Sequence, residues 1–160
     1  MRIVIHAVGR MKSGPERTLC DRYLDRFARL GGNLGFDFAG VVESAEGKAS
    51  SAEARRVEES RRLNGMIEPG LALIMLDECG KALHSQGFAT YLAGLRDDGR
   101  KSALLAIGGP DGHDAGSRRR ADLVLSLGAM TWPHQIARIL LAEQLYRAAT
   151  ILSGHPYHRE

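Results

Sequence analysis

The six residues LALIML at positions 71–76 form a short apolar run, and two similar runs follow, ALLAI at 103–107 and LVLSL at 123–127. Runs of this length and composition are typical of parallel strands that are covered on both faces. Between the first two runs, residues 85–96 repeat apolar side chains at helical spacing. This alternation predicts an α/β fold, in which helices lie on both faces of a parallel sheet.

The first half of the chain continues the same alternation. Residues 2–8 are strand-like, and residues 15–30 have a helical repeat of apolar side chains that begins at Pro15, a residue suited to a first helical turn. The remaining expected elements are a strand through Leu34, Phe36 and Phe38, a loop at 43–51, and a charged helix that ends near Met66 and is capped by Ser50 with Glu53.

Composition indicates one ordinary globular domain. The chain has 160 residues, of which 44% are hydrophobic and 26% charged, so we expect a single domain over residues 1–160. Cys20 and Cys79 belong to no CxxC or Cys/His cluster, which argues against a disulfide framework or a zinc site. No apolar run approaches the roughly 20 residues of a membrane helix, and residues 1–5 lead into the first strand without a signal-peptide pattern. We therefore expect a soluble, cytoplasmic protein with no membrane partner.

The charge balance allows a polyanionic partner without requiring one. The 22 Lys and Arg residues against 19 Asp and Glu give a net charge of +3. The run Arg118-Arg119-Arg120 is most simply a solvated helix face, with a phosphate contact as the alternative. Charge alone therefore leaves the partner open.

The last expected helix, residues 134–152, is apolar around most of its circumference. Between Ile136 and Leu152, 12 of 17 residues are hydrophobic. A surface helix normally has an apolar stripe of limited width. We therefore expect one face of this helix to pack on the sheet and another to pack on a second subunit of a two-fold homodimer, with a centrally buried helix as the alternative.

Three loops follow the three apolar runs, at residues 77–81, 108–112 and 128–133. The carboxyl ends of parallel strands share one sheet edge, where open α/β sheets bind their ligands. The loop GGPDG at 108–112 has neither the GxGxxG spacing of a dinucleotide site nor the lysine of a Walker loop, which disfavours both kinds of site. No cluster of polar, potentially functional side chains like that of the tail surrounds His6, His84 or His113 in the sequence, and we interpret these three histidines as having no role in a site.

The tail after the last helix combines four side chains that can handle protons or phosphates: His155, Tyr157, His158 and Arg159. Three interpretations stay open. The tail is a frayed end, or it binds a metal through its two histidines, although no acidic or cysteine partner lies nearby. In the third interpretation, it serves RNA phosphates and proton transfer.

Five short motifs occur in a fixed order along the chain. They are AVG at 7–9, IGGPDG at 107–112, MTWPHQ at 130–135, EQLYRA at 143–148 and HPYHR at 155–159. As an ordered set over essentially the whole chain, they closely resemble the RlmH family, the bacterial 23S rRNA pseudouridine N3-methyltransferases of the SPOUT class. The resemblance implies a parallel-sheet SPOUT fold with a C-terminal trefoil knot, a rare exception to the rule against knotted chains, with the knot and the cofactor site at about residues 71–155.

The resemblance also implies a definite activity. It implies a homodimeric enzyme that uses S-adenosylmethionine, with S-adenosylhomocysteine as product and no metal. The substrate would be N3 of a pseudouridine in the helix 69 loop of 23S rRNA in the ribosome. The cofactor-binding residues carried over by position are Leu76, Gly108, Leu127, Gly128, Ala129, Met130, Thr131 and Trp132.

On the substrate side, the resemblance indicates residues of the last helix and the tail. The matching positions are His134, Arg138, Tyr146, Arg147, His155, Tyr157, His158 and Arg159. Catalysis is expected from Arg138, Arg147 and the tail, and the general base stays open between the two tail histidines. The loop at 43–51 has one lysine against two glutamates, where related chains are often more basic, so an RNA contact by this loop is not carried over. The alternatives are a SPOUT methyltransferase that acts on tRNA and a non-catalytic ribosome-binding module.

Overall fold

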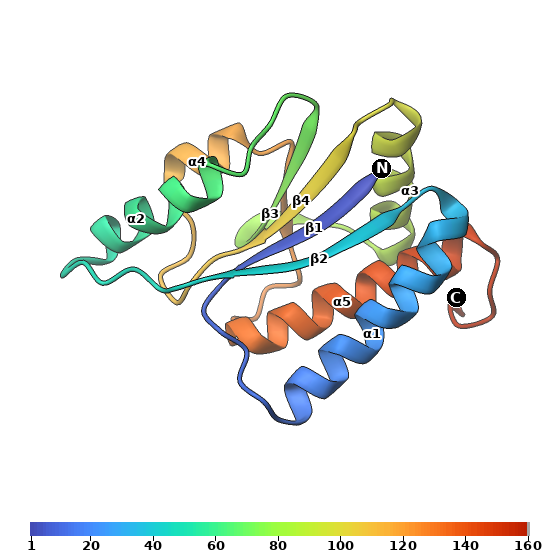
Figure 1. Cartoon of the computed structure of the whole chain (residues 1–160), viewed down its shortest axis with the longest axis horizontal. Helices are drawn as coiled ribbons and strands as arrows, with labels where there is room; N and C mark the ends of the chain where they lie inside the picture. The colour runs from blue at the N-terminus through green and yellow to red at the C-terminus, as the bar shows by residue number, and fades with distance from the viewer. Residues whose placement is uncertain (160) are drawn as a thin grey trace.

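The computed structural model describes residues 1–159 and contains a five-stranded sheet. In chain order the strands are β1 (Arg2–Val8), β2 (Asp37–Ser44), β3 (Leu71–Ala82), β4 (Ser102–Ile107) and β5 (Leu123–Ser126). Across the sheet they run in the order β2-β1-β4-β3-β5, and every neighbouring pair is parallel (Figure 1). The predicted parallel sheet is confirmed.

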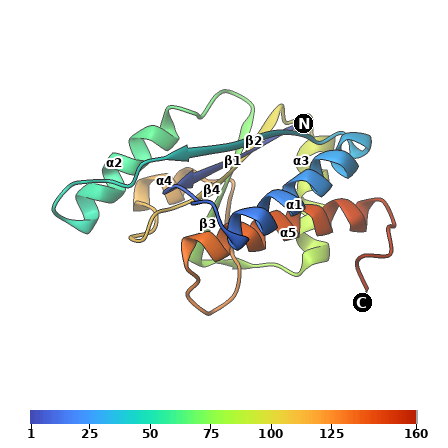
Figure 2. The ribbon, with the colours of Figure 1, turned by 60° about the horizontal axis from the view of Figure 1, so that its bottom comes forward.

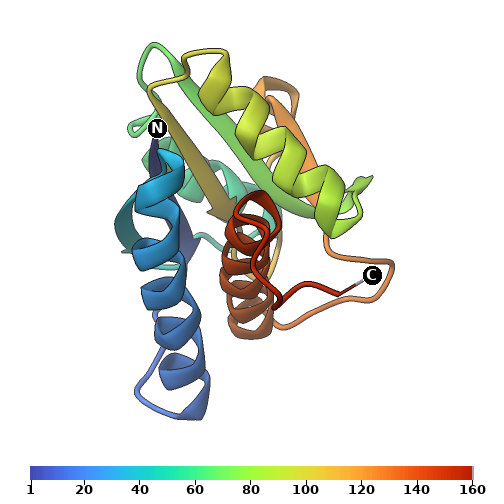
Figure 3. The ribbon, with the colours of Figure 1, turned by 90° about the vertical axis from the view of Figure 1, so that its right-hand side faces the viewer.

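Helices cover both faces of the sheet, as predicted. The helices α1 (Pro15–Gly31), α3 (Ser85–Asp97) and α5 (His134–Leu152) lie on one face, and α2 (Ala52–Asn64) and α4 (Ala115–Arg120) lie on the other (Figure 2). Seen from the side, α5 lies between α1 and α3 (Figure 3). Among the described residues, no helix combines the length and the hydropathy of a membrane span.

The two faces of the sheet build two hydrophobic cores, because successive side chains of a strand point to opposite sides. The larger core joins Ile5 and Leu105 of the central strands to α1, α3 and α5. The smaller core joins Met75 and Leu104 to Leu63 of α2. Since β4 and the first half of β3 are covered on both sides, their sequences are apolar apart from the half-buried Ser102 at the start of β4.

The last helix, α5, is more fully covered by its own chain than its sequence led us to expect. Each of its residues is buried or half-buried, because α1 and α3 flank it and the sheet lies against it. The structure therefore supports the alternative of a centrally buried helix. Apolar residues of α5 such as Ile136, Leu140 and Ile151 are only half-buried, so the packing of a second subunit against this helix stays a prediction, as does the homodimer.

Strand β3 continues beyond its apolar run and passes close to β5. The sequence predicted a loop at 77–81, but the strand extends through it, and Leu125 of β5 pairs with both Leu76 and Lys81. Gly80 lies against the backbone of β5, where an added Cβ would stand 2.7 Å from the carbonyl carbon of Leu125. The absence of a side chain at Gly80 is what permits this crossing.

Two element boundaries in the first half also differ from the predictions. Gly35 adopts a left-handed conformation, with φ of 79°, and ends a short 3₁₀ turn at Gly32–Leu34, so β2 starts later than predicted and runs on into the predicted loop. Helix α2 is capped by Ser51, whose Oγ accepts a hydrogen bond from the Ala54 amide at 3.2 Å, and not by Ser50. Gly35 thus determines where β2 starts, and the Ser51 hydroxyl determines where α2 starts. Hydrophobic periodicity does not resolve either boundary.

Candidate functional site

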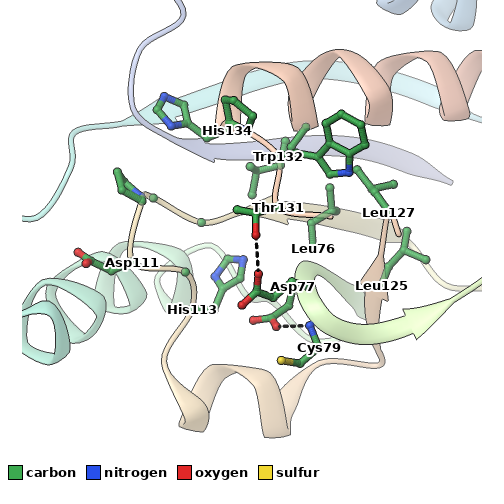
Figure 4. A pocket seen from close by; sticks show the side chains of 18 of the residues that line it. Leu76, Asp77, Cys79, Asp111, His113, Leu125, Leu127, Thr131, Trp132 and His134 are labelled. Carbon is green, nitrogen blue, oxygen red and sulfur yellow. Dashed lines mark hydrogen bonds between the residues drawn. The ribbon is translucent and has the colours of Figure 1, made fainter. Parts of the chain in front are cut away.

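A cleft of about 670 Å³ opens at the carboxyl ends of β3, β4 and β5. This is the sheet edge at which the sequence predicts a ligand site, and the volume lies in the range of small-molecule sites. Its walls are the end of β3, the loops at 107–113 and 127–133, and the start of α5 (Figure 4). The three segments named from the sequence therefore meet at one place, although the first of them is the end of β3 and not a loop.

Most of the residues expected to bind a cofactor line this cleft. The lining includes Leu76, Gly108, Leu127, Gly128, Met130, Thr131 and Trp132. Ala129 is exposed in the same loop and is not part of the lining. The fold thus brings together residues from three separate segments of the chain.

One side of the cleft is apolar and partly open to solvent. Figure 4 shows Trp132, Leu127, Leu76 and Leu125 on this side. Met130 is 70% exposed and Trp132 is 40% exposed. Large apolar side chains that are exposed together beside a hollow mark a binding surface, and these suit a flat ring of a ligand.

The other side of the cleft has carboxylates that are held by hydrogen bonds. Asp77 accepts one from the Cys79 amide at 3.0 Å and one from Arg118 Nη1 at 3.3 Å. Glu78 accepts one from Thr131 Oγ1 at 3.3 Å, which links the end of β3 to the loop at 127–133 (Figure 4). Arg118 therefore belongs to the cleft wall, whereas Arg119 and Arg120 are exposed on α4, as predicted for a solvated helix face.

The GGPDG loop is anchored to α2 by a bidentate ion pair. Arg55 donates from Nε and Nη2 to the carboxylate of Asp111, at 2.7 and 3.0 Å, and Arg56 Nη1 donates to the Asp111 carbonyl at 3.2 Å. The hydrogen bond from Arg55 lowers the pKa of Asp111 below its ordinary value. A Cβ on Gly108 would stand 3.1 Å from the carbonyl carbon of Gly112, so the tight turn favours glycine here.

His113 stands in the wall of the cleft directly after this loop. Its Nε2 lies 3.3 Å from the carbonyl oxygen of Ala106, and burial lowers its pKa, so the ring is neutral at pH 7. The position of His113 does not support its interpretation as incidental. No local sequence pattern marks this histidine, because only the fold of the GGPDG loop brings it to the cleft.

Buried polar atoms without a protein hydrogen-bond partner lie behind the GGPDG loop. They are His6 Nδ1, Glu59 Oε2, Asp114 Oδ2 and Ser117 Oγ. His6, Glu59 and Asp114 border a hollow of about 10 Å³, which is the size of one water molecule. Burial also lowers the pKa of His6 to about 4. The protein alone therefore leaves several polar groups behind this loop unsatisfied.

The predicted catalytic residues of the tail do not line the cleft. Glu143 accepts hydrogen bonds from Arg147 Nε at 2.9 Å and from the Tyr157 hydroxyl at 3.0 Å, and Arg147 Nη1 lies 3.3 Å from Nδ1 of His158. We call these four residues the tail cluster. Arg147 is 13 residues beyond His134, the cleft residue at the start of α5, which is about 20 Å along the helix.

Arg138 is predicted to be catalytic, but its side chain is buried inside the fold. Its Nη2 donates to the Gly9 carbonyl at 2.9 Å, and its Nη1 pairs with Glu43 Oε1 at 2.5 Å. These contacts tie α5 to the end of β1 and to β2. Arg138 thus joins elements of the fold and does not line the cleft.

The remaining predicted residues are divided between the cleft and the tail. His134 lines the cleft, Tyr146 is buried under the tail, and His155 and Arg159 are exposed. Within residues 1–159, no group of three or more His, Cys, Asp or Glu side chains is placed to hold a metal ion. Sequence reasoning missed Glu143 as a contact residue, although its four-residue spacing from Arg147 on a helix was a usable signal.

A family profile described as "Predicted SPOUT methyltransferase" matches residues 1–158. The chain belongs to the SPOUT methyltransferase family. This SPOUT chain is 60% identical to a protein of Brucella anthropi named ribosomal RNA large subunit methyltransferase H, over 99% of both chains. It is also 60% identical, over 99% of both chains, to the protein of that name from Mesorhizobium japonicum. The resemblance to the RlmH family is confirmed.

Solved structures of SPOUT relatives are similar at low identity. AviRb from Streptomyces viridochromogenes, a SpoU methyltransferase crystallised with AdoMet, is 16% identical with a TM-score of 0.40, covering 96% of this chain and 61% of that one. A second AviRb structure is 19% identical with a TM-score of 0.41, covering 96% and 60%. At these TM-scores the likeness adds nothing to the family match.

Proposed function

We propose that this SPOUT family member is an S-adenosylmethionine-dependent enzyme that methylates N3 of a pseudouridine in the helix 69 loop of 23S rRNA. The name of the full-length relatives, ribosomal RNA large subunit methyltransferase H, supports an rRNA substrate. The observation that carries the proposal is the cleft, where seven of the eight residues expected to bind the cofactor meet. A ribosomal substrate would place the enzyme in the cytoplasm.

The residues of the cleft suit S-adenosylmethionine. Leu127, Met130 and Trp132 offer an apolar surface for an adenine ring, and backbone groups of the GGPDG loop can bond polar edges of the nucleoside. The carboxylates of Asp77 and Glu78 complement a cationic sulfonium. When bound, the cofactor supplies an electrophilic methyl group.

The protein's own residues have two tasks in such a transfer. Methyl transfer is an in-line displacement, so the protein mainly positions donor and nucleophile, which can supply about 7–11 kcal/mol of the barrier. N3 of pseudouridine is a weakly acidic imide nitrogen that must lose its proton before it attacks, and a general base typically contributes about 10²–10⁴-fold. His155 or His158 would take this proton, and an arginine would stabilise the imide anion.

The proposed enzyme is a homodimer in which each tail acts in the cleft of the partner. Within one chain, none of the tail cluster lines the cleft, and Arg147 lies about 20 Å along α5 from His134. A tail that works at a cleft must therefore come from a second copy, and two-fold symmetry lets the two tails serve the two clefts. Pairing also doubles the cationic surface that a chain of net charge +3 offers to rRNA.

The crossing of β3 and β5 is proposed to be part of the trefoil knot. What supports this is the double pairing of Leu125 with Leu76 and Lys81, and the close approach of Gly80 to the β5 backbone. After β5 the chain passes to the opposite face of the sheet, where α5 packs between α1 and α3.

The direct test is incubation of the purified protein with labelled S-adenosylmethionine and either ribosomes or bulk tRNA, followed by mapping of the labelled nucleoside. Label on N3 of a helix 69 pseudouridine is the expected result. Label in tRNA would instead identify a tRNA-modifying SPOUT enzyme. Saturable binding of ribosomes with no label transfer, and no heat of S-adenosylmethionine binding in calorimetry, would indicate a non-catalytic module.

Mixing two inactive variants tests the shared site. The first, Trp132→Arg, puts a cation into the apolar side of the cleft, and the second replaces Tyr157, His158 and Arg159 by alanine. Mixed dimers would have one complete site, so random re-pairing of equal amounts should restore about a quarter of the wild-type rate. If each tail served its own cleft, mixing would restore nothing.

A further inference from the structure

Glu143 has no role in the proposed function so far, yet its carboxylate joins the whole tail cluster. Its Oε1 accepts hydrogen bonds from Arg147 Nε at 2.9 Å, from Arg147 Nη2 at 2.5 Å and from the Tyr157 hydroxyl at 3.0 Å. Its Oε2 accepts one from Gln144 Nε2 at 2.7 Å, and Gln144 in turn accepts one from Ser85 Oγ at 2.8 Å. Glu143 is therefore fixed both to the tail and, through Gln144, to the start of α3.

Aromatic packing holds the tail against α5 at the same place. The ring of Tyr157 lies 4.8 Å from the ring of Tyr146, and the Arg147 guanidinium lies 5.0 Å over the Tyr157 ring. Burial and hydrogen bonding, including the bond to Glu143, raise the pKa of Tyr157. The phenol therefore stays protonated and continues to donate to the carboxylate.

The geometry of Arg147 also determines the tautomer of His158. Arg147 Nη1 lies 3.3 Å from Nδ1 of His158, and a guanidinium has hydrogen-bond donors but no acceptor. Nδ1 must therefore be the unprotonated nitrogen in this pair. The ring proton of the neutral His158 is on Nε2, which faces away from the arginine as a hydrogen-bond donor.

We propose that Glu143 is the positioning residue of the tail: it fixes Arg147 and Tyr157 and, through Arg147, holds His158 in the Nε2–H tautomer. This inference rests on the proposed function, in which the tail meets a nucleobase. His158 then donates a hydrogen bond to an imide carbonyl oxygen, which gains negative charge as N3 loses its proton. The role of general base passes to another group. On the tail this is the exposed His155, once its Nδ1 is released from the hydrogen bond that it accepts from the Tyr157 amide at 3.2 Å.

Histidine NMR of the full-length protein tests the tautomer without any assay of methylation. In the ¹⁵N-histidine spectrum of the wild type, His158 should give the pattern of a ring protonated on Nε2. Glu143→Gln should leave Arg147 free to move and give His158 a mixed tautomer, and Arg147→Lys should do the same. The matched control is Glu58→Gln, because Glu58 makes the same four-residue pair with Arg62 at 3.3 Å, away from the tail. In the Glu58→Gln variant, the ¹⁵N pattern of His158 should equal that of the wild type.

Either of two results would overturn the inference: a wild-type His158 protonated on Nδ1, or a pattern that Glu143→Gln leaves unchanged. Single-turnover methylation adds a second readout. Glu143→Gln should slow it by about 100-fold without changing the affinity for S-adenosylmethionine, because a misplaced group impairs the reaction and not cofactor binding. An unchanged rate would also refute the positioning role. A wild-type protein with the expected tautomer but no methylation would refute only the proposed function.

Discussion

The cleft and the tail cluster are two polar regions of one small fold, and they are built in opposite ways. The cleft has glycine turns, exposed apolar side chains such as Met130 and Trp132, and unpartnered polar atoms behind the GGPDG loop. In the tail cluster, Glu143, Arg147, Tyr157 and His158 bond to one another. Polar groups that lack hydrogen-bond partners within their own chain are suited to bind a ligand. Side chains that already bond to one another hold a fixed arrangement and are suited to contact a partner together.

The largest expected effect is on the crossing that borders the cleft. Gly80→Ala puts a Cβ 2.7 Å from the carbonyl carbon of Leu125, so the backbone must move, and we expect a loss of about 3 kcal/mol in the free energy of unfolding. Gly94→Ala in α3 is the control, because nothing lies within 4 Å of its Cβ, and it should stabilise by about 0.5 kcal/mol. Urea unfolding measures both. Equal free energies of unfolding for the two variants would show that the close approach of β3 to β5 does not require glycine at position 80.

The second effect concerns the unpartnered groups behind the cleft. Burial lowers the pKa of His6 from 6.5 to about 4, so between these pH values the unfolded chain binds a proton that the folded chain does not. The free energy of unfolding should therefore fall as pH falls from 6.5 to 4, by up to about 3 kcal/mol. His6→Gln should reduce this slope in urea titrations at several pH values, whereas Tyr157→Phe in the tail should keep it. Identical slopes in all three proteins would contradict the assignment to His6.

The third effect separates binding from stability. Trp132→Ala removes an exposed ring, so the free energy of unfolding should change by less than about 0.5 kcal/mol. The loss of a stacking surface for adenine should weaken S-adenosylmethionine binding by about tenfold in calorimetry. An unchanged affinity would place the cofactor elsewhere.

The smallest effect is expected in the tail, with the opposite pattern. Tyr157→Phe deletes the hydroxyl that donates to Glu143 at 3.0 Å, which should lower the free energy of unfolding by about 1 kcal/mol. Because Tyr157 does not line the cleft, calorimetry should give the wild-type affinity for S-adenosylmethionine. A weakened affinity without lost stability would mean that the tail already reaches a cofactor site.

Much of the fold was predictable, because periodicity and apolar runs reflect burial directly. The runs at 71–76 and 103–107 are strands covered on both faces, and α5 has the predicted bounds. The extension of β3 was not predictable, since Gly80 looks like a turn residue in sequence but serves a backbone crossing in space. How much of α5 its own chain covers was not predictable either, because helix amphipathicity does not reveal that α1 and α3 flank it.

The candidate site also has a part that was predictable from the sequence and a part that was not. The loops at the sheet edge were found because the carboxyl ends of parallel strands meet, whatever their side chains. Arg118 and His113 were missed, since their partners Asp77 and Ala106 come from other strands. Arg138 was carried over as catalytic from a resemblance, but a sequence cannot show that the fold encloses its side chain between Gly9 and Glu43.

The length of α5 has a consequence for how this protein can vary. The helix is a rigid spacer between the cleft at its first turn and the residues that hold the tail beyond its middle. One inserted turn would carry the tail about 5.4 Å further out, more than a hydrogen bond can stretch. In the proposed dimer, where the tail acts in the cleft of the partner, the length of α5 must therefore stay constant, whereas insertions in surface connections are tolerable.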